Sequence, residues 1–222
     1  MAFTSNTAQT QILLDTSTLL LAKFMYYTAD GTNESDVLKV NVETLSCRTF
    51  ELTIANTANA AFQPGDLVTG VTSNNTGYVS EWRSTTNTLV ITETSGAFTN
   101  AEVLTLNRTG KLVPTTATVV TPARQIEINS IWYSITGGAL SVELGFNGVH
   151  ANNTAYVHPV MMLSDSNYFG KNALPGQITN PALNPTGNFS ISTYKTEAHT
   201  SLSYTVIVQF RKTQGFAQRP IY

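Results

Sequence analysis

Hydrophobic and polar residues alternate along much of the chain, which is the pattern of half-buried β-strands. The longest alternating segment, 202–210, places every second residue on one apolar face. A shorter segment, 38–43, places Leu38, Val40 and Val42 on its apolar face and Lys39, Asn41 and Glu43 on its polar face. The dense apolar run 19–27 predicts a buried strand. Strands therefore dominate the predicted structure.

A hairpin is predicted between residues 131 and 146. Apolar residues alternate up to Thr136, Gly137-Gly138 supplies a two-residue turn, and the alternation resumes at Leu140. Residues 147–188 are rich in turn-forming residues and predict loops, with a short strand at 156–163; a further strand is expected around Phe189 and Ile191. Because no segment shows helical periodicity, the fold class is predicted to be all-β, a jelly-roll-like β-sandwich.

Residues 51–118 differ from the rest of the chain and contain an internal repeat. Ala61–Thr69 lines up with Ala97–Thr105 at an offset of 36 residues. The shared pattern predicts an anchoring Phe, a tight turn and a strand entered through an acidic residue, and segments 77–82 and 88–92 predict a hairpin between the copies. Two copies are too few for a solenoid. We therefore expect a small barrel-like β-module inserted into the sandwich.

These patterns divide the chain into three predicted parts. Residues 1–17 are polar and Thr-rich without periodicity, and we expect an irregular N-terminal arm that a partner surface would order. Residues 18–50 and 119–222 form the discontinuous sandwich domain, and residues 51–118 form the inserted module.

Composition and charge narrow the function further. Thr, Ser and Asn number 35, 17 and 19 of 222 residues, a share that favours strands and turns over a helical bundle. The net charge of -2, without a basic block, argues against a nucleic-acid partner. No apolar run approaches the ~18 residues of a membrane span. The N-terminus lacks the pattern of a secretory signal, so synthesis in the cytoplasm is expected.

The search for catalytic and metal-binding patterns is negative, so we expect neither an enzyme nor a cofactor. His150, His158 and Asp165 are near in sequence but lack the spacing of a metal site, and we interpret the histidines as loop residues. Cys47 is the only cysteine and carries no nucleophile signature, so a small buried hydrophobe is its expected role.

Aromatic residues are the candidates for partner binding. Trp82 and Trp132 each fall opposite the aliphatic face of their strand, which suits a second layer or an intersubunit contact. Sugar stacking is the alternative role for such side chains. Phe3 in the N-terminal arm, and Phe216 and Tyr222 in the C-terminal tail, complete the set, because both ends of the chain are candidates for clamping neighbouring subunits.

Two stretches resemble virion structural proteins of tailed bacteriophages. Residues 30–42, DGTNESDVLKVNV, are similar to a "DGT-x-ES-x-V-x-KV-x-V" segment of those proteins, and residues 128–133 and 142–144 fill the places of the two strands that follow it there. Residues 62–70 and 76–79 look like the "F-x-x-GE-x-V-x-G" and "TG-x-V" phrases of a phage head and tail β-module, with Asp66 in place of Glu. Here the module separates the first segment from its strands, which departs from the pattern.

The resemblance implies a structural component of a phage particle. We expect a capsid decoration (cement) protein that binds the major capsid protein on the outer shell, stabilises it and resides in the virion as a homo-oligomer. The alternative is a tail, neck or head-fibre protein, with or without binding to a host-surface carbohydrate. Many weak contacts multiplied by symmetry would hold either kind of subunit in place.

Overall fold

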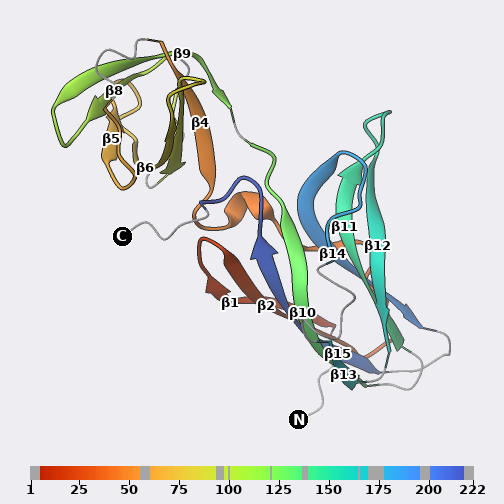
Figure 1. Cartoon of the computed structure of the whole chain (residues 1–222). Coiled ribbons are helices and arrows are strands. Elements are labelled where there is room, and N and C mark those ends of the chain that lie inside the picture. The colour runs from red at the N-terminus through yellow and green to blue at the C-terminus, as the bar shows by residue number, and fades with distance from the viewer. Residues whose placement is uncertain are drawn as a thin grey trace. The chain divides into compact units, whose positions relative to one another are not determined.

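The structure is a computed structural model, and it describes residues 6–55, 61–93, 98–99, 101–120, 122–136, 140–164, 166–169, 178–195 and 201–217. The predicted all-β class is confirmed, because the described residues form β-strands and one short 3₁₀ helix, Val42–Thr44, and contain no α-helix (Figure 1). They divide into two compact units. One contains residues 6–45 and 124–213, and the other contains residues 46–123 and 214–217.

The first unit is a β-sandwich of two antiparallel sheets, with strand orders β1-β2-β15-β10-β13 and β12-β11-β14-β3. The five-stranded sheet consists of β1 (Thr7–Asp15), β2 (Leu19–Thr28), β10 (Ile126–Thr136), β13 (Ser166–Phe169) and β15 (Leu202–Lys212). The four-stranded sheet consists of β3 (Val37–Val40), β11 (Leu140–Val149), β12 (Ala155–Leu163) and β14 (Pro185–Lys195).

Aromatic side chains from both sheets meet in the sandwich core. The ring of Phe189 in β14 lies 5.9 Å from Phe24 in β2, 5.7 Å from Phe146 in β11 and 5.0 Å from Phe210 in β15. All four side chains have 0% exposure. Burying each one contributes about 1.5–3 kcal/mol. The apolar faces predicted at 202–210 and around Phe189 are confirmed, as is the strand predicted at 156–163.

The predicted irregular arm is wrong for residues 7–15, which form β1. This strand lies at the edge of the five-stranded sheet, pairs with β2 and is exposed at most positions on both faces. A strand held by backbone hydrogen bonds without side-chain burial leaves no alternating hydrophobic pattern, so periodicity could not reveal it. Residues 1–5 lie outside the described part of the chain.

The predicted hairpin between residues 131 and 146 is also wrong. β10 pairs with β13 and β15, whereas β11 belongs to the other sheet and pairs with β12 and β14. The two strands therefore contribute to opposite walls of the core. Local turn chemistry shows where a strand ends, but distant strands decide which sheet the returning strand joins.

The faces predicted for residues 38–43 are wrong at Leu38 and Lys39 and confirmed at Val40 and Val42, which are buried. Leu38 is 48% exposed, whereas Lys39 is buried at 7% exposure. The pairing of β3 with β14 is irregular between Val40 and Leu38, which changes the alternation. Lys39 can occupy the interior because it has a carboxylate partner there, described below.

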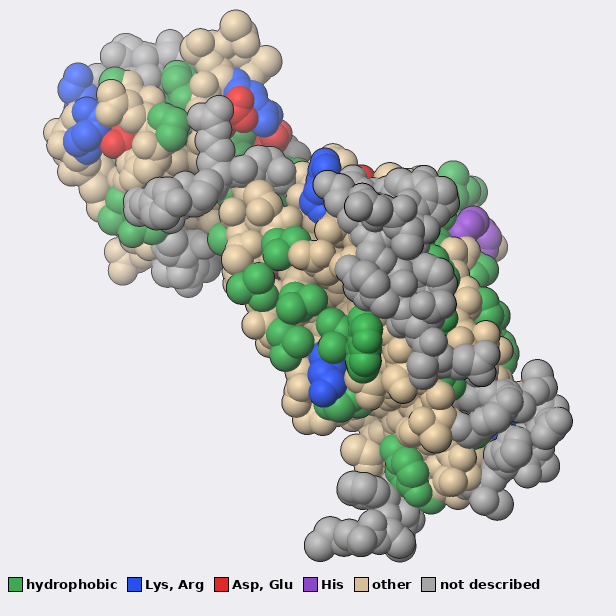
Figure 2. All heavy atoms as spheres, turned by 60° about the horizontal axis from the view of Figure 1, so that its bottom comes forward, with side chains coloured by type: hydrophobic (Ala, Val, Ile, Leu, Met, Phe, Trp, Pro, Cys, Tyr) green, Lys and Arg blue, Asp and Glu red, His purple; other side chains and the backbone are tan. Residues whose placement is uncertain are grey.

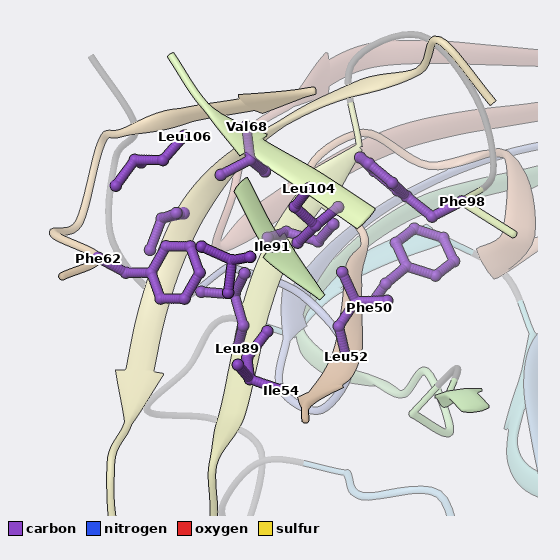
Figure 3. Close-up of a cluster of buried hydrophobic side chains, with 12 residues drawn as sticks. Phe50, Leu52, Ile54, Phe62, Val68, Leu89, Ile91, Phe98, Leu104 and Leu106 are labelled. Atoms are coloured by element: carbon purple, nitrogen blue, oxygen red, sulfur yellow. The ribbon is translucent and has the colours of Figure 1, made fainter. Parts of the chain in front are cut away.

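The second unit is a closed barrel with the strand order β4-β7-β6-β5-β8-β9. Its strands are β4 (Thr49–Ile54), β5 (Leu67–Gly70), β6 (Thr76–Arg83), β7 (Thr88–Glu93), β8 (Val103–Leu106) and β9 (Lys111–Val120). The predicted hairpin of β6 and β7 is confirmed. Buried apolar side chains from the strands converge inside the barrel, together with Phe62 and Phe98 (Figure 3).

The boundaries of the units differ from the predicted ones. Residues 46–50 belong to the barrel unit, and so does the C-terminal segment 214–217. Within that unit Phe216 forms an isolated antiparallel bridge with Arg48, and the amide of Ala217 donates to the carbonyl of Cys47 at 2.9 Å. The chain therefore passes between the two units three times, once more than a simple insertion requires.

Candidate interaction surface

The outward side of the five-stranded sheet is the main candidate for a functional surface, and we call it the open face. Strand alternation points every second residue of β2, β10 and β15 away from the core, where it is half-buried or exposed. Hydrophobic side chains gather on one face of the sandwich in Figure 2, with a basic side chain among them. The apolar and basic members of the open face are Leu19, Leu21, Lys23, Met25, Tyr27, Trp132, Ile207 and Arg211.

One cross-strand row lies at the centre of this face. Lys23 in β2 pairs with Ile207 in β15, which pairs with Trp132 in β10. Trp132 is 42% exposed. Lys23 forms no ion pair with a described residue, although Leu21 and Met25 flank it on its own strand. The row therefore offers an indole, an aliphatic side chain and one positive charge to a partner.

Polar groups on the rest of the open face are largely bound within the sheet. The side-chain oxygen of Gln209 accepts from Asn129 and from Ser130, both at 2.9 Å. At the end of the face Arg211 lies 3.9 Å from Glu127. These contacts leave the apolar side chains and Lys23 as the groups that a partner could engage.

The outward side of the four-stranded sheet has a different character. Ser190 donates to Asn147 at 2.8 Å, Ser192 donates to Asp36 at 2.9 Å, and the hydroxyl of Tyr194 donates to Glu143 at 3.3 Å. Burial and the nearby Glu143 carboxylate raise the pKa of Tyr194, which keeps this donor protonated. The polar side chains of the central rows bond one another, although Leu38 and Met162 in the same rows are 48% and 53% exposed.

A buried ionic network fixes the loop that precedes β3. The Nζ of Lys39 lies 2.5 Å from Oε1 of Glu34, and the two side chains are 2% and 4% exposed. Tyr204 in β15 donates its hydroxyl to the other Glu34 oxygen, and Thr193 in β14 donates its backbone amide to the Glu34 carbonyl at 2.9 Å. Burial and the Glu34 charge raise the pKa of Tyr204 far above its usual value. The network links the two sheets and is structural in its geometry.

The barrel repeats its architecture with the offset seen in the sequence. Leu67 pairs with Tyr78 in the first copy, and Val103 pairs with Pro114 in the second, so both partners shift by 36 residues. The copies meet where Thr69 of β5 pairs with Thr105 of β8, its own equivalent. A local pseudo-two-fold axis therefore passes through this pair.

The acidic residues of the repeat close equivalent turns. Asp66 accepts the amide of Gln63 at 2.8 Å, and Glu102 accepts the amide of Thr99 at 2.9 Å. Burial raises the pKa of the Glu102 carboxyl, but hydrogen bonds from Ser73 and from the amides of Thr99 and Thr72 outweigh burial and hold the pKa below its usual value.

The remaining contacts of the two carboxylates differ because their side chains differ in length. Glu102 reaches the amide of Ser73 at 2.6 Å and fills the space beside Gly70, where a Cβ would lie 2.2 Å from its Oε1. The shorter Asp66 instead pairs with Arg108 at 2.8 Å. Burial raises the pKa of Asp66, but Arg108 and the Gln63 amide lower it further. Both carboxylates therefore have turn-capping roles.

The other candidate aromatic residues are not exposed platforms. Trp82 was expected opposite the aliphatic face of its strand, but a bulge between Val79 and Glu81 resets the alternation, and Trp82 packs on the barrel core with its ring 5.2 Å from Phe62. Phe216 is only 4% exposed, so it is not a free tail side chain. Phe3 and Tyr222 lie outside the described residues.

The structure brings no candidate metal ligands together in the part of the chain that it describes, where no group of three His, Cys, Asp or Glu side chains could hold an ion. His150 stacks on Tyr156 with ring centroids 4.1 Å apart, and Asp165 lies outside the described residues. Cys47 is half-buried with a φ of 60°, a turn position. Within the same described residues, no helix has the length and hydropathy that a membrane span needs.

No protein-family model, curated protein or solved structure matches this chain significantly. The site is therefore defined by its own geometry. Trp132 was identified from the sequence, but the central Lys23 was missed. Residues 19–27 were predicted to be fully buried, and a half-buried strand over the same residues would have placed Lys23 outward.

Proposed function

We propose that this chain is a non-enzymatic structural subunit of a tailed-phage particle, a capsid decoration protein that binds the major capsid protein on the outer shell. The open face carries the proposal. A half-exposed tryptophan, an isoleucine and a lysine that has no ion pair with a described residue form one row on this sheet, whereas polar side chains on the outward side of the other sheet bond one another. The resemblance of residues 30–42 to virion proteins of tailed phages is the reason for proposing a phage particle as the assembly.

The chemistry of the open face specifies its partner. Apolar side chains around Lys23 suit a mostly apolar surface that presents one carboxylate, because a cation buried without a counter-charge is costly. Each such contact need only be weak, since a shell repeats it many times and lets clamped subunits stabilise one another.

Copy number in purified particles is the first test. Quantitative mass spectrometry against the major capsid protein should find hundreds of copies, roughly the number expected for a shell lattice. About a dozen copies or fewer would move the chain to the tail, neck or head fibres, and absence from particles would refute the virion proposal.

Binding of the purified chain to undecorated shells tests the open face itself. Trp132→Ala should weaken binding by about tenfold or more, as expected for a central aromatic contact, and Lys23→Glu should do the same by reversing the charge. Tyr194→Ala is the matched control, because Tyr194 is 45% exposed on the opposite face. Equal effects of Trp132→Ala and Tyr194→Ala would rule out the open face as the contact.

The second candidate is a particle protein that binds a host-surface carbohydrate, and the exposed indole of Trp132 is the observation that favours it. Glycan-array binding that is lost in Trp132→Ala, together with a low copy number, would support this alternative over decoration.

A further inference from the structure

We infer that β1 pairs with β1 of a second copy of this chain, in an antiparallel ladder about a two-fold axis that joins the two five-stranded sheets. The inference goes beyond the proposed function and does not depend on it, because it rests on the strand alone. β1 pairs with β2 on one side and has no strand partner on its other side among the described residues. An edge strand directs the N–H and C=O groups of alternate residues outward, where another strand can bind them.

The edge formed by β1 lacks most of the features that prevent strand pairing, and the bulge near Leu13 is the exception. It is nine residues long, and Thr7–Leu14 contains no charged residue and no proline. The other three sheet edges are protected in recognisable ways: β3 and β13 are four residues each, and β12 carries Pro159. Natural sheets block exposed edges with short strands, prolines or charges. β1 is the one described edge of the sandwich that is longer than four residues and contains no proline, and its only charge, Asp15, lies at the end of the strand.

Three consecutive aliphatic side chains reinforce the edge. Ile12, Leu13 and Leu14 are 47%, 50% and 43% exposed, at a bulge where the pairing with β2 shifts. Isolated exposed aliphatic residues are common on protein surfaces, but three in a row on an edge strand are not. A partner strand would remove part of this surface from water at the same time as it satisfied the backbone.

A second copy of β1 fits this edge better than an unrelated strand because the edge is self-complementary. Two-fold antiparallel pairing sets the segment Thr7–Leu14 against itself, and the absence of charge means that no like charges meet. The one charged residue of the strand, Asp15, is held by Lys212. With the axis near Gln11, the two Asp15 residues would lie about 27 Å apart. The contact is isologous, so it closes as a dimer and does not propagate into a fibre.

Sedimentation velocity of the full chain, from about 1 to 100 µM, tests the pairing. We expect a dimer for the natural sequence, and a dimer dissociation constant raised about tenfold or more in Ile12→Lys and in Leu13→Lys, because each places like charges in the ladder. Val71→Lys is the control, since Val71 is 58% exposed in the barrel unit and the substitution has the same chemistry. Melting temperatures close to that of the natural chain will show that all variants fold.

Cysteine cross-linking gives an independent readout. In a Cys47→Ser background, single cysteines at Gln9, Gln11 and Leu13 should include one that forms a disulfide with its own copy, because only a residue near the axis meets its equivalent within the ~7 Å that a disulfide spans. A monomer across the concentration range would overturn the inference. So would Ile12→Lys and Leu13→Lys dimers as tight as Val71→Lys, or no disulfide at any of the three positions. Particle copy number plays no part here, so this pairing and the proposed function can fail separately.

Discussion

The barrel and the sandwich satisfy their backbones in opposite ways. The barrel closes its ladder through all six strands, so it has no sheet edge, and its buried carboxylates cap its own turns. Among its described residues, the sandwich leaves β1 unpaired on one side and presents Trp132 and Lys23 outward. The barrel therefore pairs all of its strands within itself, whereas the sandwich has the edge and the open face at which we propose that other chains bind.

The largest effects should come from the two cores and should stay within their units. Phe189→Ala in the sandwich should cost about 3–5 kcal/mol and Ile91→Ala in the barrel about 2–5 kcal/mol. Hydrogen exchange followed by mass spectrometry should show faster exchange in the unit that carries the substitution. Faster exchange in both units after either change would mean that the two units unfold together, and they could then no longer be treated as separate folding units.

The buried ionic network should come next. Lys39→Met leaves the Glu34 carboxylate buried without a counter-charge, and we expect the free energy of unfolding to fall by about 3–5 kcal/mol. Adding Glu34→Gln should recover much of this loss, because the uncompensated charge is then gone. Chemical denaturation measures both variants. A single variant as stable as the natural chain would show that Glu34 finds another partner or water.

Acid should weaken the barrel through its turn carboxylates. Hydrogen bonds lower the folded-state pKa values of Asp66 and Glu102, so their contribution to stability is present above the unfolded values of about 4 and is lost as the pH falls through the folded values. Glu102→Gln should cost about 1–3 kcal/mol at pH 7 and should flatten this acid dependence. Denaturation between pH 2 and 7, at about one-unit steps, gives the comparison. An unchanged slope in the variant would assign the acid sensitivity elsewhere.

The two tryptophans should give the smallest and most informative contrast. Trp82→Ala should destabilise the barrel by about 1–3 kcal/mol, because its ring packs on the core beside Phe62. Trp132→Ala should change stability by no more than about 0.5 kcal/mol, because the indole faces outward. Thermal unfolding measures both. A large loss of stability in Trp132→Ala would make this residue part of the fold and weaken its role as a contact.

Much of this fold could be predicted from the sequence where one face of a strand is buried. The segments around Phe189 and Phe210 alternate because the core requires it, and the β6–β7 hairpin follows from local alternation. β1 could not be found in this way, since neither of its faces is covered. The sheet to which β11 belongs could not be predicted either. Its pairing with β12 and β14 depends on contacts with strands that are distant in the sequence, not on the pattern within β11 itself.

The candidate site residues were also predicted correctly only where the alternation of the strand is regular. Trp132 was identified because its strand keeps a regular alternation at that point. Trp82 was misplaced because one extra residue, at a bulge near Ser80, turns the following side chains to the opposite face. Lys39 was misplaced for a related reason, since a buried lysine depends on Glu34 and Tyr204, which no periodic pattern encodes.

The pairing of Thr69 with Thr105 has a consequence for how the barrel can be built. Exchanging β4 with β7, β5 with β8 and β6 with β9 leaves the circular strand order unchanged. Each of these three exchanged pairs is one kind of strand. Residues 49–83 contain the first member of every pair, and residues 88–120 contain the second. Two identical half-length chains could therefore close the same barrel, because each would supply all three kinds of strand, and Asp66 and Glu102 mark one place where the two copies in this chain differ.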